Sequence, residues 1–405
     1  MDSSNEKIGR RIRELRSFRG LTLEQLAGLS GFSKGYLSLL ERGRKPIDKR
    51  STLEAIAAAL RVAPSDLASI PWPINDAVAG EARLAANLIG DALAEFRLGD
   101  DVEVAPRPWH EIAADVRRLR EQLVPKADYA AQGYLIYALV EELLAVYNTS
   151  SAHRTDALKA LATCYSAAAG ATKATGKSSL AWVAADRMIS VSEQIGQPEY
   201  SAWAAWRRVH MIDGQRRDRQ ISQAVKWIDR FSNHTGNPQV LQAIGQMHLT
   251  TAMAHAALNN DDESATHLRE AGILARHLKQ DVGTFGGMWF GRTNVAIWTV
   301  ALAVESGNYG AADAAAKEVN LAALPSKGRR AEFHAEYGRA LAHMNPSRGR
   351  AVSEILKAEQ LAPQLIRNHP LLRETVGGLL SRKLPDAATR ELRGIAYRMG
   401  IAPIG

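Results

Sequence analysis

The first 68 residues contain five short stretches in which apolar side chains recur every three or four positions. Such spacing places the apolar side chains on one face of an α-helix, and glycine, proline or a capping residue separates each stretch from the next. The stretches are KIGRRIRELRSFRG, TLEQLAGLSG, SKGYLSLLERG, STLEAIAAALRV and APSDLASI. This pattern predicts a small domain of five helices.

A tight turn is predicted between the second and third helices. Thr22 and Gln25 match a capping box, in which the threonine oxygen accepts from the Gln25 amide and the glutamine side chain reaches back. Gly31 stands where a sharp turn needs a positive φ, which glycine adopts without a Cβ penalty. Ser33 then caps the third helix.

The third predicted helix has a buried face and an outer face. Leu37 and Leu40 point inward at a spacing of three residues. The outer face begins with small and polar side chains: Lys34, Gly35, Ser38 and Leu39. Such a face suits the major groove of DNA, where the first residues of a recognition helix meet base edges. A helical glycine costs about 1 kcal/mol, so Gly35 indicates a close backbone approach.

These five stretches resemble the Cro/repressor family of helix-turn-helix domains, also called the xenobiotic-response-element family. The resemblance covers about residues 6–68, through IRELRSFRGLTLEQLAGLSGFSKGYLSLLERGRKP and LEAIAAALRVAPSDL. It implies a five-helix, λ-repressor-like domain that binds an operator in double-stranded DNA. The alternative is a helical domain of the same shape that never binds DNA.

The resemblance also implies roles for individual residues. Base-edge contacts would come from Ser33, Lys34, Gly35, Ser38 and Leu39, and phosphate contacts from Thr22, Leu23, Tyr36, Arg42, Arg44 and Lys45. Arg16 and Glu41 match a partly buried ion pair that braces the first helix against the third. Leu39 departs from the family pattern, in which an arginine or another polar residue is frequent. It would touch a thymine methyl or read no base.

After this domain, two prolines flank Trp72, and we predict a semi-rigid connector over residues 69–80. The segment 81–405 has helical patterns separated by Gly, Pro, Asn or Asp. One short alternating run, DVEVAP at 101–106, is the only candidate strand.

The helices of the long segment come in pairs. MHLTTAMAHAALNNDDESATHLREAGILARHL and NVAIWTVALAVESGNYGAADAAAKEVNLAAL share an alanine-rich helix, a polar turn and a second helix. Their spacing of roughly 40 residues is near the tetratricopeptide range. The segment resembles degenerate tetratricopeptide-like repeats, so we predict an all-α chain whose second domain is a helical-repeat solenoid with a concave binding groove. The alternative is a compact helical bundle without a groove.

One stretch of this segment, FGGMWFGRTNVAIWTVALAVESG at 285–307, is a candidate ligand site. Its candidate residues are Trp289, Arg292, Asn294 and Trp298. Asn294 would bond a ligand amide or backbone while the two tryptophans wall a pocket. The alternative is that the aromatic rings fill the core between helices and that Asn294 bridges neighbouring helices.

Charge and composition narrow the choice of partners. Residues 1–70 carry 13 Lys or Arg and 8 Asp or Glu, so most of the net charge of +8 lies near the N-terminus and favours a polyanion partner there. No apolar run approaches the ~18 residues that a membrane span needs, and the N-terminus lacks the apolar core of a signal peptide. We expect a cytoplasmic protein without a membrane partner. Its one cysteine, Cys164, forms no internal disulfide.

Motifs for catalysis and metal binding are incomplete, so we expect no enzyme, no cofactor and no metal. ATKATGKS at 171–178 formally fits a relaxed phosphate loop but follows a helical pattern, and HEIAA at 110–114 lacks the second histidine of a zinc-peptidase helix. His248 and His255 lie seven residues apart, too far to share one ion without further ligands. We predict that RRDR at 216–219 is a solvated loop and that Cys164 is a buried, inert thiol.

Three classes of function remain. The preferred one is a DNA-binding regulator whose repeat domain forms a homodimer and senses a peptide or small molecule. Its domain order resembles the peptide-responsive quorum-sensing regulators of Gram-positive bacteria and the repeat-bearing regulators of actinobacteria. The alternative is a scaffold whose repeats bind a protein partner while the first domain holds it on DNA. An enzyme is the third class, disfavoured for want of an assembled site.

Overall fold

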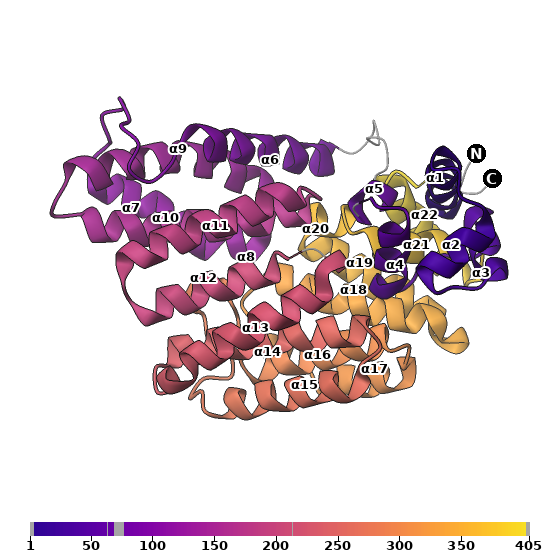
Figure 1. Cartoon of the computed structure of the whole chain (residues 1–405). Coiled ribbons are helices and arrows are strands. Elements are labelled where there is room, and N and C mark those ends of the chain that lie inside the picture. The colour runs from indigo at the N-terminus through magenta and orange to yellow at the C-terminus, as the bar shows by residue number, and fades with distance from the viewer. Residues whose placement is uncertain (1–3, 63, 69–76, 213, 402–405) are drawn as a thin grey trace.

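The computed structural model describes residues 4–62, 64–68, 77–212 and 214–401, and within these ranges the chain is all-α (Figure 1). The described part contains no strand, only an isolated bridge between Val282 and Gly291. The DVEVAP run forms no strand, because it has no partner with which to pair. The predicted fold class is confirmed: a five-helix domain is followed by a domain of paired helices.

The first domain is built as its apolar pattern predicts. Its helices are α1 (Ser4–Phe18), α2 (Leu23–Ser30), α3 (Lys34–Glu41), α4 (Arg50–Ala59) and α5 (Pro64–Ala68). Their inner faces bury one core, to which Ile12, Leu26 and Ile56 contribute fully buried side chains. Both hydrogen bonds of the Thr22 capping box are present, and Gly31 has a φ of 76°.

The second domain begins earlier than the sequence suggests. The predicted connector at 69–80 lies outside the described residues up to position 76, and a helix already starts at Ala77. The helices are α6 (Ala77–Glu95), α7 (Trp109–Arg118), α8 (Val124–Lys126), α9 (Tyr129–Thr149), α10 (Arg154–Ala174), α11 (Ser178–Ile195), α12 (Pro198–His210), α13 (Arg217–Phe231), α14 (Pro238–Ala257), α15 (Asp261–Arg276), α16 (Arg292–Glu305), α17 (Tyr309–Ala316), α18 (Lys327–His343), α19 (Arg348–Leu361), α20 (Pro363–Arg367), α21 (Pro370–Leu380) and α22 (Asp386–Arg398).

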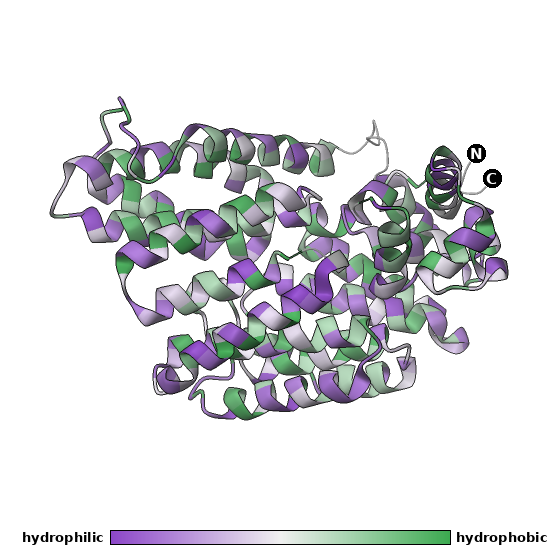
Figure 2. Ribbon diagram, viewed as in Figure 1, coloured by the Kyte–Doolittle hydropathy of each residue, from purple (hydrophilic) through white to green (hydrophobic). Residues whose placement is uncertain are grey.

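Helices that follow one another in the chain pack in pairs, most extensively α10 with α11, α14 with α15 and α18 with α19. Alanine and glycine also allow a close approach between α6 and α9, which are not consecutive: Gly133 of α9 lies so near Ala85 of α6 that a Cβ would overlap it. Most helices carry hydrophobic and hydrophilic positions together (Figure 2), as stacked amphipathic pairs require. None of the described helices is both long enough and apolar enough to cross a membrane.

The five-helix domain packs on the C-terminal helices of the second domain, and α1 lies beside α21 (Figure 1). Leu371 of α21 is 3% exposed and belongs to the same core as the buried leucines of α3. A second contact joins α4 to the short helix Gly214–Arg216. The two domains therefore share apolar as well as polar contacts.

A carboxylate of the second domain caps α4. Lys49, at the N-cap position, provides no side-chain hydrogen bond to the helix. Instead Glu305 of α16 accepts from the backbone N–H of Ser51 at 2.9 Å and from that of Arg50 at 3.3 Å. Glu305 is 2% exposed. These first-turn N–H groups have no partner within the helix, so α4 depends on the second domain for its cap.

Ion pairs surround this cap. The Arg50 guanidinium donates to Glu336 of α18, and Arg339 donates both to Glu336 and to the backbone carbonyl of Asp48. Burial opposes ionisation of Glu336, but Arg339 and Arg50 lower its pKa to about 2. Each buried charge thus has a partner, the condition under which burial of a charge is tolerated.

The capping of α4 by Glu305 leads to a prediction about the stability of the protein. Replacing Glu305 with alanine leaves two first-turn N–H groups of α4 without an acceptor, and we expect a loss on the order of 2 kcal/mol in the free energy of unfolding. Hydrogen exchange should quicken at the amides of residues 50–53, and urea unfolding should shift to a lower midpoint. Glu305→Gln, which keeps an acceptor oxygen, should lose less. The exposed Glu318→Ala serves as control; equal protection of the α4 amides in Glu305→Ala and Glu318→Ala would contradict the capping role.

Candidate functional site

The first residues of α3 form an open surface. Ser33 accepts a hydrogen bond from the N–H of Tyr36 at 3.2 Å and so begins the helix. Lys34 and Gly35 follow it and are exposed, and no atom outside the local backbone lies within 4 Å of the position that a Cβ on Gly35 would take. Ser38 is partly exposed and Leu39 is 37% exposed. The five residues predicted to read bases therefore lie along one accessible face of α3, which begins at its N-cap.

Lys34 has an intramolecular partner on this surface. Its Nζ lies 2.6 Å from Oε1 of Glu24 in α2, and both side chains are more than half exposed. The lysine lowers the pKa of the Glu24 carboxyl through their hydrogen bond. An exposed pair of this kind contributes little to stability, because water screens it. Lys34 can therefore exchange Glu24 for another acceptor at low cost.

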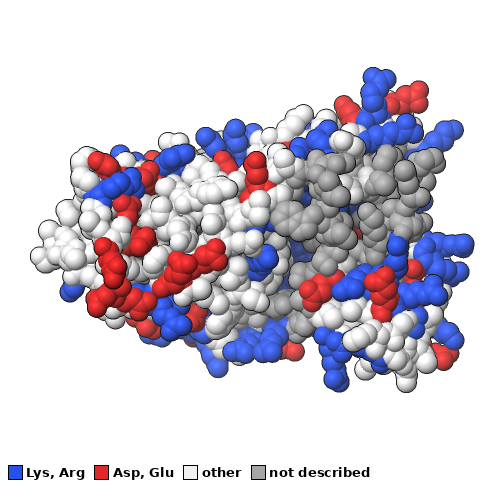
Figure 3. All heavy atoms as spheres, turned by 90° about the horizontal axis from the view of Figure 1, so that it is seen from above, with Lys and Arg blue, Asp and Glu red and all other residues white. Residues whose placement is uncertain are grey.

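The residues predicted to contact phosphate flank this surface. Thr22, Arg42, Arg44 and Lys45 are exposed, whereas Leu23 and Tyr36 are partly buried. The Lys45 Nζ lies 4.5 Å from the centre of the Tyr36 ring, and Arg42 Nε donates to the Ser38 carbonyl at 2.9 Å. Figure 3 shows Lys and Arg side chains gathered at the end of the molecule that carries this domain.

Arg16 of α1 and Glu41 of α3 hold the surface in place. Arg16 donates through Nε at 2.6 Å and through Nη2 at 3.0 Å to the two carboxylate oxygens of Glu41. Its Nη1 donates to the Leu21 carbonyl at 2.7 Å. The Glu41 side chain is only 6% exposed. This two-point geometry sets the angle between α1 and α3.

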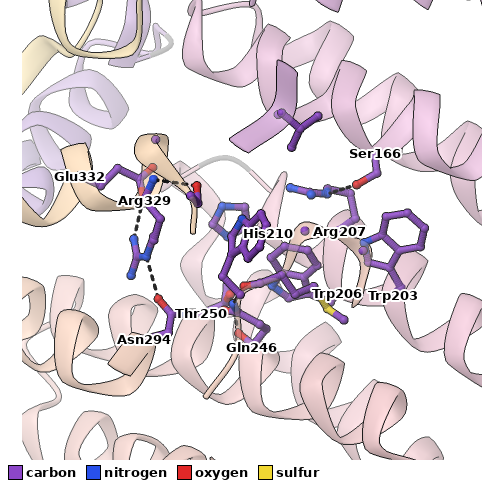
Figure 4. A pocket seen from close by; sticks show the side chains of 18 of the residues that line it. Ser166, Trp203, Trp206, Arg207, His210, Gln246, Thr250, Asn294, Arg329 and Glu332 are labelled. Carbon is purple, nitrogen blue, oxygen red and sulfur yellow. Dashed lines mark hydrogen bonds and ion pairs between the residues drawn. The ribbon is translucent and has the colours of Figure 1, made fainter. Parts of the chain in front are cut away.

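A second candidate site is a cavity of about 1420 Å³ inside the second domain. Side chains from α10, α12, α14, α16 and α18 line it, and Arg50 and Glu54 of α4 close one side. The alternative of a compact bundle without a groove is therefore wrong. Figure 4 shows Arg207, His210 and Trp206 pointing into the cavity from α12, opposite Arg329 and Asn294.

Three basic side chains form what we call the cationic wall of the cavity: Lys173 of α10, Arg207 of α12 and Arg217 of α13. Lys173 is open to the cavity yet surrounded by protein, and burial together with the charges of Arg217 and Arg207 lowers its pKa to about 7. Burial likewise lowers the pKa of Arg207 to about 10. His210 beside them has a pKa well below its ordinary value, first because of burial and then because of these cations.

Aromatic rings cover the neighbouring wall. The Arg207 guanidinium lies 4.4 Å from the centre of the Trp206 ring, which also stacks on His210. Trp203 meets Phe285 edge to face, with ring centres 5.5 Å apart. Phe285 stands on the loop between α15 and α16, where Gly286 has a φ of 60° and packs so close to Trp203 that a side chain would overlap the indole.

Three of the four predicted ligand residues line this cavity, namely Trp289, Asn294 and Trp298. Asn294 is 1% exposed and accepts from Arg329 Nε at 2.7 Å, so its carbonyl oxygen is already used. Arg292 does not line the cavity. It is exposed and pairs with Asp281 at 3.1 Å, because the first turn of α16 directs it outward.

Sequence reasoning missed the cationic wall. Arg217 belongs to the RRDR stretch expected to be a solvated loop, but it is only 12% exposed and pairs with Glu54 of α4 at 2.5 Å. That expectation is wrong for Arg217, because its partner lies 163 residues away in the other domain. Lys173 falls within the stretch considered as a phosphate loop. There, α10 continues to Ala174 and Gly176 ends it with a φ of 81°, so the lysine faces the cavity from a helix.

Cys164 and the HEIAA stretch have ordinary structural roles. Cys164 is fully buried, and burial raises the pKa of its thiol to about 12. The thiol is therefore protonated and inert at neutral pH. The HEIAA stretch begins α7, where Ile112 is buried and His110 is exposed.

The histidines of α14 acquire a neighbour that their spacing does not reveal. His267 of α15 lies between them, with its Nδ1 2.9 Å from Nδ1 of His248 and its ring stacked on that of His255. His255, Glu263 and His267 each offer a ligand atom within 4.8 Å of the others. These three residues could hold a metal ion.

Comparison with known proteins places the first domain in a family. The family model described as a helix-turn-helix domain matches residues 7–70. The uncharacterized HTH-type transcriptional regulator RghRB of Bacillus subtilis is 42% identical over 55 residues, which are 14% of this chain and 40% of that protein. The HTH-type transcriptional repressor RghR of the same organism is 39% identical over 57 residues, 14% of this chain and 42% of that protein. The chain thus spans about two fifths of the length of these two relatives.

Two solved structures were also found. PlcR of Bacillus thuringiensis, in complex with the peptide PapR7 and DNA, matches with a TM-score of 0.28 and 15% identity over 67% of this chain and 95% of that one. The apo form of the competence regulator ComR of Streptococcus vestibularis matches with a TM-score of 0.27 and 12% identity over 99% of this chain and all of that one. TM-scores this low do not establish a shared fold.

One relative is matched along nearly its whole length. The HTH-type transcriptional regulator DdrOP3 of Deinococcus deserti is 32% identical over 128 residues, which are 28% of this chain and 98% of that protein. Together with the α2–turn–α3 geometry, this similarity identifies the chain as a member of the family of helix-turn-helix transcriptional regulators.

Proposed function

We propose that this chain is a sequence-specific, ligand-responsive transcriptional regulator that acts as a homodimer in the cytoplasm. The observation that carries the proposal is the accessible face of α3, on which Lys34 and Gly35 are exposed and Ser38 is partly exposed. The α4 side of the same domain faces the second domain, so docking leaves this surface accessible.

DNA binding follows from the chemistry of this surface. A lysine ammonium at the start of a recognition helix can donate to the acceptor atoms of guanine in the major groove, and a glycine lets the backbone come close. Arg44 and Lys45 supply the positive charge that phosphates attract. Two copies of α3 on one palindromic operator would stand about 34 Å apart, one turn of DNA.

The cavity supports a sensor rather than a scaffold as the role of the second domain. It is a deep, partly open cavity, it carries aromatic rings and two basic side chains that no carboxylate of the described residues pairs with, and residues of α4 form part of its lining. A scaffold would use an exposed face, whereas a peptide or small molecule in this cavity would touch Arg50 and Glu54 directly. We assign the chain no reaction of its own and no membrane partner.

Lys34 provides the first test. Lys34→Ala should weaken binding to an operator selected from random DNA by the wild-type protein, by about 1–3 kcal/mol, and should relax the preference at one base position, because a base-edge contact is lost. Fluorescence anisotropy with the operator and with single-base variants measures both effects. Arg117→Ala, which removes an exposed charge on α7, is the control. An unchanged affinity and base preference would remove Lys34 from the reading surface.

Arg44 provides the complementary test. Arg44→Ala should weaken binding to every DNA sequence alike and should lower the slope of log affinity against log salt by about 1, because one phosphate contact is lost. Titrations at several salt concentrations, on operator and unrelated DNA, measure this slope. A loss confined to the operator would make Arg44 a base reader instead, and no loss on either DNA would contradict the phosphate contact.

A further inference from the structure

Two cations of the cavity have no acidic partner. Lys173 Nζ donates to the backbone carbonyl of His210 at 2.6 Å. Arg207 Nε donates to the Ser166 hydroxyl at 3.0 Å (Figure 4). Among the described residues no carboxylate pairs with either of them. By contrast, Arg329 on the facing wall is paired with Glu332 at 2.6 Å. The cavity therefore holds two positive charges that its own side chains leave uncompensated.

Burial and mutual repulsion make these charges unfavourable. Burial lowers the pKa of Arg207 to about 10, and burial with the repulsion of Arg217, Arg207 and Arg50 lowers that of Lys173 to about 7. A pKa lowered in this way means that the charged form is destabilised. A negative charge placed between the two side chains would offset both the burial and the repulsion.

The unpartnered polar atoms of the lining point to the same chemistry. Among the described residues that line the cavity, five have a buried side-chain nitrogen or oxygen without a hydrogen-bond partner, and four of these atoms are N–H donors. The donors are Arg50 Nη1, Trp203 Nε1, Trp206 Nε1 and Arg329 Nη2; the fifth atom is Gln242 Oε1. A ligand that satisfies them must be rich in acceptors.

The volume and the aromatic lining of the cavity indicate what the ligand contains besides its acceptor groups. Pockets for drug-sized ligands measure about 300–1,000 Å³, and this cavity has about 1420 Å³, so it has room for an organic molecule. Trp203, Trp206 and Phe285 offer ring faces and edges beside the cations. A bare inorganic ion would leave these rings uncovered, whereas an anion with an apolar body would contact them.

Building on the proposed sensor role, we propose that the cavity binds an organic anion whose carboxylate or phosphate group lies between Lys173 and Arg207 and whose apolar body packs on Trp203 and Trp206. The proposed anion site adjoins the contact between the domains, because Arg217, the third member of the cationic wall, holds Glu54 of α4.

A matched pair of fluorescent probes tests the site in the full chain. 1-Anilinonaphthalene-8-sulfonate carries an anionic sulfonate in place of the carboxylate or phosphate, and N-phenyl-1-naphthylamine has a similar apolar body without charge. We expect saturable binding of the anionic probe, with energy transfer from tryptophan. In the double variant Lys173→Gln/Arg207→Gln its affinity should fall roughly tenfold or more, while that of the neutral probe changes by less than about twofold.

Three controls accompany this test: one for the loss of a charge, one for misfolding and one for the chemical class of the anion. Arg117→Gln removes one exposed charge and should leave both affinities unchanged, and circular dichroism reports whether each variant folds. Displacement of the anionic probe by phenylacetate or by phenyl phosphate, with phenylacetamide as the neutral control, distinguishes a carboxylate from a phosphate ligand. The inference is overturned if the folded double variant binds the anionic probe as the wild type does, or if the wild type binds it no better than the neutral probe. The probe experiments contain no DNA, so a negative result would overturn the anion site without bearing on operator binding.

A second inference rests on the histidine cluster of α14 and α15. The ligand atoms of His255, Glu263 and His267 lie within 4.8 Å of one another, and His255 Nδ1 is buried without a partner among the described residues. Imidazole nitrogens and a carboxylate oxygen that lie this close together can share one ion.

We infer that His255, Glu263 and His267 bind a divalent transition metal ion of the zinc class, for which nitrogen and carboxylate ligands are suited. The contact of 2.9 Å between Nδ1 of His248 and Nδ1 of His267 leaves the other ring nitrogen of His267 for the ion. His248 thus orients a ligand without binding the metal itself.

Calorimetric titration of the chelator-treated full chain with Zn²⁺ tests this site. We expect one tight site that His267→Ala abolishes and His248→Ala weakens about 10–100-fold. Exposed His110→Ala should leave it intact. Loss of binding in His110→Ala as well, an unchanged site in His267→Ala, or no tight site in the wild type would overturn the inference.

Discussion

The arrangement of this molecule depends on one interaction, the capping of α4 by Glu305. The N-cap residue of α4, Lys49, provides no capping side chain, and the carboxylate that caps the helix instead lies 254 residues from Ser51, in the other domain. Because Glu305 is buried, the two domains must meet at one place and in one orientation to satisfy both the helix and the carboxylate. Arg50, Glu336 and Arg339 then complete the pairing of charges that this contact buries.

Two functional surfaces follow from that orientation. Docking through α4 turns the first residues of α3 away from the second domain and leaves Lys34, Gly35 and Ser38 accessible. It also brings Arg50 and Glu54 to the lining of the cavity. The same short helix α4 therefore belongs to the domain that carries the exposed face of α3 and also contributes to the lining of the cavity.

The sequence predicted the first domain well because its determinants are local. The Thr22 capping box, the turn at Gly31 and the Ser33 cap each involve residues within about four positions of one another, and the apolar spacing of α3 identifies its inner face. Trp289, Asn294 and Trp298 were found because a cluster of aromatic residues and glycines is visible in a short stretch. Arg292, from the same stretch, lies outside the cavity, since neighbours in a helix point in different directions.

By itself the sequence determined the fold class, the five-helix domain and the outward face of α3, because hydrophobic periodicity, caps and turns act over a few residues. Only the tertiary structure decided that Glu305 caps α4, that Arg217 holds Glu54, that Lys173 and Arg207 share one cavity, and that His267 joins the histidines of α14. Each of these is a pairing of charges or ligands from distant helices. Electrostatic partners are set by position in space, and no periodicity along the chain records which helices come together.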